Sequence, residues 1–149
     1  MSTLDVFSQV SIHADNVCLK PVPWKDLETY GLLITNGLFT QGQQNTAGMY
    51  YDPDNLVDSA RKLVSEQLSS WSSLTAESWK LDFGIYVDNV LVGRQLVGAE
   101  NFLLSKMVYS DSFVIPAWRS KGVGTKARAA MSTAMVSNAA SDKVSQTLG

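Results

Sequence analysis

The chain has 149 residues, of which 45% are hydrophobic and 17% are charged, so we expect one folded domain over residues 1–149. A net charge of −2 excludes a protein that coats nucleic acid through bulk positive charge. No apolar stretch reaches the roughly 18 residues of a membrane span, and the first ten residues lack the Lys or Arg of a secretory signal, so we expect a cytoplasmic protein.

The first half of the chain predicts one strand and two helices. A short strand is expected at Val17–Pro21, after a turn at residues 14–16, and a helix is expected from Pro23 toward Ile34. Residues 36–53 hold three glycines and a proline and are predicted to be a loop. Asp54 is the expected cap of an amphipathic helix that ends at the serines of residues 69–73. The apolar positions of that helix recur at spacings of three and four: Leu56, Val57, Ala60, Leu63, Val64 and Leu68.

The second half changes to the period of a strand. Apolar residues alternate over 81–87, Asp88-Asn89 predicts a tight turn, and Val90–Ala99 is expected to return as the second strand of a hairpin. A third strand is expected at Met107–Ile115, and the alanine-rich segment from Lys126 favours a helix. This order predicts a mixed α/β (α+β) domain rather than a doubly wound one.

A glycine turn between the third strand and the last helix is the most informative chemical feature. Gly122 and Gly124 let the backbone approach a ligand, and the N–H groups at the start of the helix favour a phosphate or pyrophosphate. Four of the twelve basic residues lie around the turn, with no acidic residue among them: Arg119, Lys121, Lys126 and Arg128. The alternative is a simple turn without a ligand.

Two other phosphate motifs fit less well. The spacing Gly122-x-Gly124-x-x-Ala127 satisfies the loose dinucleotide fingerprint, but that motif opens a βαβ unit, and no later strand with a ribose-binding acid is visible. The G-x-x-x-x-G-K-[ST] pattern of a P-loop is absent. Both alternatives fail because of what surrounds the glycines.

The segment Arg119–Gly124 resembles the acyl-CoA pyrophosphate loop, Q/R-x-x-G-x-G/A, of the GNAT N-acetyltransferase superfamily. A second match is at Asn138-Ala139-Ala140-Ser141 and Leu148-Gly149, which resemble the N-x-A-S…L-G-[YF] signature of the ribosomal-protein N-terminal acetyltransferase subgroup. The order of predicted elements before the loop also matches that family. The resemblance implies a GNAT-like fold, in which helices flank a central, mostly antiparallel sheet.

The same resemblance implies an N-acetyltransferase whose co-substrate is acetyl-CoA and whose acceptor is an amine of a protein N-terminus or a small molecule. A neutral amine attacks the thioester directly, and backbone N–H groups stabilise the oxyanion. The loop would hold the pyrophosphate, and Arg119 would either anchor the loop or reach a phosphate. The edge of the strand would pair with the pantetheine arm, and Asn138 and Ser141 would line the other side of that arm. The implied cofactor-binding residues are Phe113, Val114, Ile115, Arg119, Ser120, Lys121, Gly122, Val123, Gly124, Thr125, Asn138 and Ser141.

The chain departs from the family after the glycine turn. Met135-Val136-Ser137 joins the two matching segments directly, which leaves no sequence for the strand that the family has there, and no aromatic follows Gly149. We therefore expect a domain that is shortened on its C-terminal side. The alternative function is then a binding or dimerisation module with impaired acyl transfer. The other explanation for the missing strand is that the sequence omits residues of the working protein. The edge of the strand at Met107–Ile115 would then be covered by a homodimer contact or form a cleft that CoA fills only in part.

The general base has two carboxylate candidates. Strand alternation places Asp111 on one face with Tyr109 and Phe113, where desolvation by apolar neighbours would suit a base near neutral pH. Glu100, after the preceding strand, is the other candidate, and Tyr109 completes the expected catalytic set. The alternative for each carboxylate is an exposed position with no role. The single Cys18 and single His13 are expected to be structural or exposed, with no disulfide and no metal site.

Overall fold

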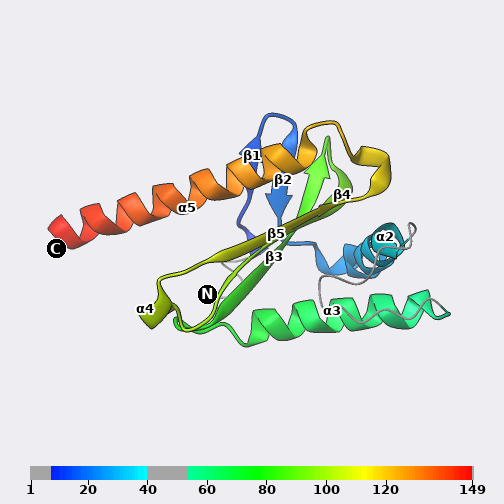
Figure 1. Cartoon of the computed structure of the whole chain (residues 1–149), viewed down its shortest axis with the longest axis horizontal. Helices are drawn as coiled ribbons and strands as arrows, with labels where there is room; N and C mark the ends of the chain where they lie inside the picture. Colours follow the sequence, from blue (N-terminus) through cyan, green and yellow to red (C-terminus); the bar gives the residue numbers. More distant parts are fainter. Residues whose placement is uncertain (1–7, 40–53, 149) are drawn as a thin grey trace.

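The computed structural model describes residues 8–39 and 54–148, with the side chains of residues 36–39, 56 and 136–148 outside the description. A five-stranded sheet forms the centre of the molecule (Figure 1). The strands follow one another across the sheet in chain order, and every pairing is antiparallel. They are β1 (Ile12–Ala14), β2 (Val17–Lys20), β3 (Trp79–Val87), β4 (Val90–Ala99) and β5 (Tyr109–Val114).

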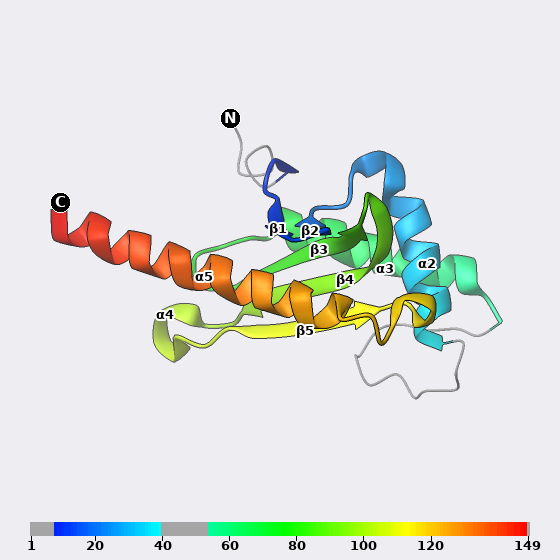
Figure 2. The same cartoon turned by 90° about the horizontal axis from the view of Figure 1, so that it is seen from above.

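Helices cover both faces of this sheet. A 3-10 turn at Trp24–Asp26 leads into α2 (Leu27–Phe39), which packs with α3 (Leu56–Ser72) on one face. The opposite face carries α5 (Val123–Leu148), whose distal end extends past the sheet in both views (Figures 1 and 2). The short helix α4 (Phe102–Ser105) joins β4 to β5, and a 3-10 turn at Pro116–Trp118 leads from β5 toward α5.

Two apolar clusters hold the layers together. Beneath α5, Val123, Ala127 and Met131 pack on the face of the sheet that carries Phe83 and Ile85. The cluster on the other face joins α2 and α3 through Tyr30, Ile34 and Leu63. Alternation along each strand therefore divides apolar side chains between two covered faces, which explains why β3 and β4 are buried on both sides.

The fold class expected from the sequence, a mixed α+β domain with a mostly antiparallel sheet, is confirmed. Several boundaries differ. The expected loop at 36–53 is wrong at its start because α2 continues to Phe39, and residues 40–53 lie outside the description. The cap of α3 is Asn55 rather than Asp54, since the Asn55 side chain accepts the N–H of Asp58 at 3.1 Å.

Two further differences concern strands. The sequence did not predict β1, a strand of three residues that pairs with β2. The third expected strand is shorter than Met107–Ile115, since β5 covers Tyr109–Val114. The segment after Val123 is one continuous helix, so no strand follows β5 in the described part of the chain. None of the described helices is long and apolar enough to span a membrane.

The outer edge of β5 is left without a neighbouring strand among the described residues. The N–H of Ile115 donates to the carbonyl of Val92 at 2.9 Å, so this end of the strand faces β4. Backbone groups of an antiparallel strand alternate between the partner and the opposite side. Residues 111, 113 and 115 therefore bond to β4, whereas residues 110, 112 and 114 direct their N–H and C=O groups to the outer edge.

Candidate functional site

A pocket of about 440 Å³ lies where the end of β5 meets the start of α5. The glycine turn forms one wall of this pocket, and the last residues of β5 form another. Its lining residues are Ser112, Phe113, Val114, Trp118, Arg119, Ser120, Gly122, Val123, Gly124, Thr125 and Arg128. The structure thus brings together most of the residues that the sequence predicts to bind a cofactor, including both glycines.

The backbone of the glycine turn leaves several N–H groups for a ligand. Ser120 and Gly122 have φ values of 61° and 77°, a left-handed conformation that favours glycine. The first helical hydrogen bond runs from the Lys126 N–H to the Gly122 carbonyl at 3.0 Å. The N–H groups of residues 123–125 therefore have no acceptor inside the helix, and they lie at the positive end of the helix dipole. Such an arrangement suits a phosphate.

Room for a ligand exists at both glycines. A Cβ added to Gly122 would meet no atom within 4 Å, and one added to Gly124 would meet only a methyl of Val114, at 3.7 Å. The space that these missing side chains leave is therefore open. A pocket whose wall is bare backbone lets an anion come close to the N–H groups.

The four basic residues around the turn have different roles. The Nε of Arg119 donates to the carbonyl of Val114 at 2.9 Å, and its guanidinium lies 5.3 Å from the centre of the Phe113 ring. Arg119 therefore holds the turn against the end of β5. Lys126 lies 3.5 Å from a carboxylate oxygen of Asp15 in the β1–β2 turn and does not line the pocket. Lys121 and Arg128 are exposed; Arg128 lines the pocket, and the Nζ of Lys121 lies 5.0 Å from the centre of the ring of Trp118, which also lines it.

The edge of β5 differs in detail from the sequence prediction, which names Phe113, Val114 and Ile115 as the residues that pair with a ligand. Phe113 and Ile115 direct their backbone groups to β4, and the Val114 carbonyl already accepts from Arg119. The free backbone groups in the pocket wall are the N–H of Val114 and both groups of Ser112. The difference arises because β5 pairs with a neighbouring strand on one side only. Alternate residues therefore direct their backbone groups either to β4 or to the outer edge.

Neither a protein-family model nor a curated protein matches the sequence. Solved structures match its fold. RimL, a ribosomal L7/L12 alpha-N-protein acetyltransferase in complex with coenzyme A, superposes with a TM-score of 0.62 and 13% identity, over 83% of this chain and 66% of that chain. RimJ of Mycobacterium smegmatis in complex with CoA-disulfide gives a TM-score of 0.58 and 18% identity, over 81% and 57%. A Vibrio cholerae protein described as a ribosomal-protein-serine acetyltransferase gives 0.59 and 14%, over 83% and 65%.

The chain has the GNAT acetyltransferase fold. It spans between 57% and 66% of the length of these three structures. The GNAT resemblance that the glycine turn indicates in the sequence is therefore confirmed at the level of the fold. Two of the GNAT positions, Asn138 and Ser141, lie in α5, but their side chains are outside the described residues.

The catalytic candidates of the GNAT resemblance lie outside the pocket. Asp111, Tyr109 and Glu100 are all exposed, and none of them lines the pocket wall. The expected desolvation of Asp111 is wrong, because its side chain is exposed. Alternation along β5 assigns a residue to one face of the sheet but does not say whether other side chains cover it there. Asp111 lies opposite Leu96 on the α2–α3 side of the sheet, whereas Ser112 faces α5.

A buried charged triad on the α2–α3 face was not predicted from the sequence. The hydroxyl of Tyr30 donates to Asp82 at 3.1 Å, and the Nε of Arg94 lies 2.8 Å from the other oxygen of the same carboxylate. Burial raises the pKa of Asp82 although Arg94 opposes the shift. Arg94 is paired with Phe113 across β4 and β5, so the triad lies under the strand that forms the pocket wall. A polar residue inside an apolar strand, such as Asp82, is the signal that could have indicated it.

The single histidine and cysteine meet at the β1–β2 hairpin. The Sγ of Cys18 lies 3.9 Å from the Nε2 of His13. Burial raises the pKa of the Cys18 thiol, although Lys20 opposes the shift, so the nucleophilic thiolate is disfavoured. The described part of the chain has no group of three side chains suited to a metal ion.

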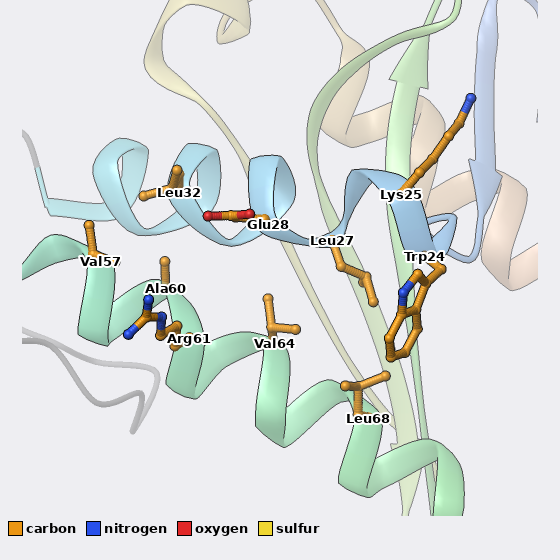
Figure 3. A pocket seen from close by; sticks show the side chains of 10 residues that line it. All are labelled: Trp24, Lys25, Leu27, Glu28, Leu32, Val57, Ala60, Arg61, Val64 and Leu68. Carbon is orange, nitrogen blue, oxygen red and sulfur yellow. The ribbon is translucent and has the colours of Figure 1, made fainter.

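A second concavity, of about 550 Å³, lies between α2 and α3 (Figure 3). Trp24 is 77% exposed and extends over the far end of α3, near Leu68. The residues that line this concavity are Trp24, Lys25, Leu27, Glu28, Leu32, Val57, Ala60, Arg61, Val64 and Leu68. None of the catalytic or cofactor-binding candidates is among them.

Proposed function

We propose that the chain is an acyl-CoA-dependent N-acyltransferase that moves an acetyl group from acetyl-CoA to a primary amine. The observation that carries the proposal is the meeting of two kinds of backbone donor in one pocket. Phosphate-binding N–H groups at the start of α5 and the unpaired edge of β5 face the same space. A ligand with a charged diphosphate and an extended amide arm matches this combination.

The diphosphate would bind at the glycine turn. The N–H groups of Val123, Gly124 and Thr125 have no acceptor inside the helix, and the exposed Lys121 and Arg128 add positive charge beside the pocket. Arg119 keeps the turn in place through its bond to Val114. An anion is favoured there because the first turn of α5 carries no acidic residue.

The pantetheine arm would lie along the outer edge of β5 as an extra strand. Val114 offers one N–H, and Ser112 offers an N–H and a carbonyl. The Ser112 N–H is the last outward donor of the pocket wall and is suited to polarise the thioester carbonyl. A fixed donor at that oxygen stabilises the oxyanion that forms when an amine attacks.

The transfer itself would be a direct attack. A neutral amine nitrogen forms a bond to the thioester carbon, the C–S bond breaks, and the CoA sulfur leaves with the electron pair. Asp111 is the group proposed to take the proton of the amine, and Glu100 and Tyr109 are the other candidates. All three side chains are exposed, so an amine substrate in solution can reach them. The acceptor is an amine of a protein N-terminus or of a small molecule.

A binding module without transfer is the second candidate. The position of the carboxylates favours it, because neither Asp111 nor Glu100 lines the pocket. In that case the chain would bind CoA at the glycine turn and hold a partner, such as a second copy, at the open edge of β5.

Calorimetric titration with acetyl-CoA and, side by side, with NAD tests the binding step. We expect acetyl-CoA to bind and NAD not to bind at the same concentration. Release of free CoA thiol in the presence of an amine or an N-terminal peptide then tests transfer. Binding without thiol release would favour the binding module, and no binding of acetyl-CoA would refute both functions.

A further inference from the structure

Most of the exposed large apolar side chains in the described part of the chain gather at one place. Five of the nine lie within residues 103–109, which we call the α4–β5 patch: Leu103, Leu104, Met107, Val108 and Tyr109. Leu104 is 89% exposed and Met107 is 72% exposed. Every residue from 103 to 111 is exposed, so the patch is continuous from α4 into the first half of β5. A contiguous apolar patch of this kind is typical of a contact with another molecule.

The outer edge of β5 continues the patch and is open to pairing. Figure 2 shows β5 as the outermost strand of the sheet. The backbone groups of Ser110 and Ser112 point away from β4, and no other described strand pairs with them. Exposed edges are usually protected by Lys, Pro or a bulge, and β5 has none of these. The molecule that covers the patch can therefore add a strand to the sheet.

A second copy of β5 fits this edge in one register. When two identical edges pair antiparallel, the residues that point outward lie opposite each other about a two-fold axis. An axis at Asp111 would set two carboxylates opposite each other, which is unfavourable. An axis at residue 110, or at any residue beyond 111, would pair residue 114, whose carbonyl already accepts from Arg119. An axis at Tyr109 avoids both conflicts.

The register about Tyr109 also matches apolar and charged residues. The two Tyr109 side chains lie opposite each other, and the apolar residues 107–109 of the two copies meet. Asp111 is then opposite Met107 of the second copy and one residue from the Lys106 of that copy. This pair has opposite charges, and the two-fold axis forms it twice. The edge is thus complementary to itself in hydrogen bonding, apolar contact and charge.

We propose that two copies of the chain associate through their β5 edges and α4–β5 patches, and that acetyl-CoA and the second copy exclude each other. In the antiparallel pair, α4 of one copy lies beside the C-terminal half of β5 of the other copy. The pantetheine arm uses the outward groups of Ser112 and Val114 in the same half. The exclusion rests on the proposed function, whereas the dimer does not.

Sedimentation velocity over a range of protein concentrations tests the dimer. We expect wild type to change from monomer to dimer, and Met107→Glu, which sets a carboxylate opposite Asp111, to stay monomeric. Ser110→Pro removes an outward N–H but no bond to β4, and should also stay monomeric. Val90→Glu, at an exposed apolar residue at the opposite end of β4, is the matched control and should dimerise as wild type does. A monomeric wild type, or a dimer that persists in either folded variant, would refute the interface.

Acetyl-CoA tests the exclusion. At saturation it should convert the wild-type dimer to monomer. In calorimetry, wild type should bind acetyl-CoA about four-fold more weakly at a protein concentration about ten times the dimer dissociation constant than in dilute solution, because few chains are then monomeric. Met107→Glu should have the same affinity at both concentrations. Acetyl-CoA that binds without dissociating the dimer would refute the exclusion. If acetyl-CoA binds at neither concentration, the proposed function and the exclusion fail together, while the sedimentation result for the dimer stands.

Discussion

Arg119 ties the glycine turn to the strand before it, because its Nε donates to the carbonyl of Val114 at 2.9 Å. The same guanidinium lies over the ring of Phe113, at 5.3 Å from its centre. One side chain thus occupies an outward carbonyl of β5 and fixes the direction in which the turn leaves the strand. The position of the N–H groups at the start of α5 depends on this contact.

Replacement of Arg119 by alanine should weaken acetyl-CoA binding by about ten-fold, because a charged hydrogen bond is lost and the turn is less well fixed. Calorimetry measures the change. Arg61→Ala, at an exposed arginine of α3 away from the pocket, is the control and should leave the affinity unchanged. Equal affinities of Arg119→Ala and wild type would show that the turn needs no anchor.

Replacement of Asp111 by asparagine should lower the rate of transfer about a hundred-fold near neutral pH while acetyl-CoA still binds. Part of the rate should return at high pH, where the amine is already deprotonated. The pH profile of kcat checks this, with Glu100→Gln as the parallel variant. A loss of the same size at every pH would argue against Asp111 as the base.

Removal of one partner from the buried triad should destabilise the fold strongly. Arg94→Met leaves Asp82 as a buried carboxylate without its cation and should cost about 3–5 kcal/mol in the free energy of unfolding. Tyr30→Phe removes one neutral donor from the same carboxylate and should cost less, about 1–2 kcal/mol. Urea denaturation gives both values. If Arg94→Met costs no more than Tyr30→Phe, the ion pair is not the main element of the triad.

Alkaline pH should destabilise the protein through Tyr86. Burial, with the nearby charge of Asp26, raises the pKa of Tyr86 from 10.0 to about 12. The folded state therefore favours the neutral phenol, and this stabilisation is complete below pH 10 and is lost as the pH rises toward 12. Thermal unfolding over pH 9–12 should show a smaller decline for Tyr86→Phe than for wild type. Parallel curves for the two proteins would contradict the assignment.

The sequence predicted what depends on neighbours along the chain. The glycine turn, the hairpin at Asp88-Asn89 and the amphipathic helix α3 are local patterns, and the structure has all three. What failed depends on contacts across the sheet. The exposure of Asp111 and the outward direction of the Ser112 backbone follow from β5 being an edge strand, which no local pattern reveals. The partner of Asp82 is likewise a residue of another strand, twelve positions later in the chain.

The most direct test of the proposed phosphate site is the substitution of Gly124 by valine. A Cβ added at Gly124 meets only a methyl of Val114, at 3.7 Å, and the rest of the valine side chain extends into the pocket, so the fold should persist while the anion is kept from the N–H groups. Ala129→Val places the same β-branched side chain at an exposed position of the same helix and is the matched control. We predict that calorimetry detects acetyl-CoA binding to wild type and Ala129→Val but not to folded Gly124→Val. Unchanged affinity of a folded Gly124→Val protein would contradict phosphate binding at the glycine turn.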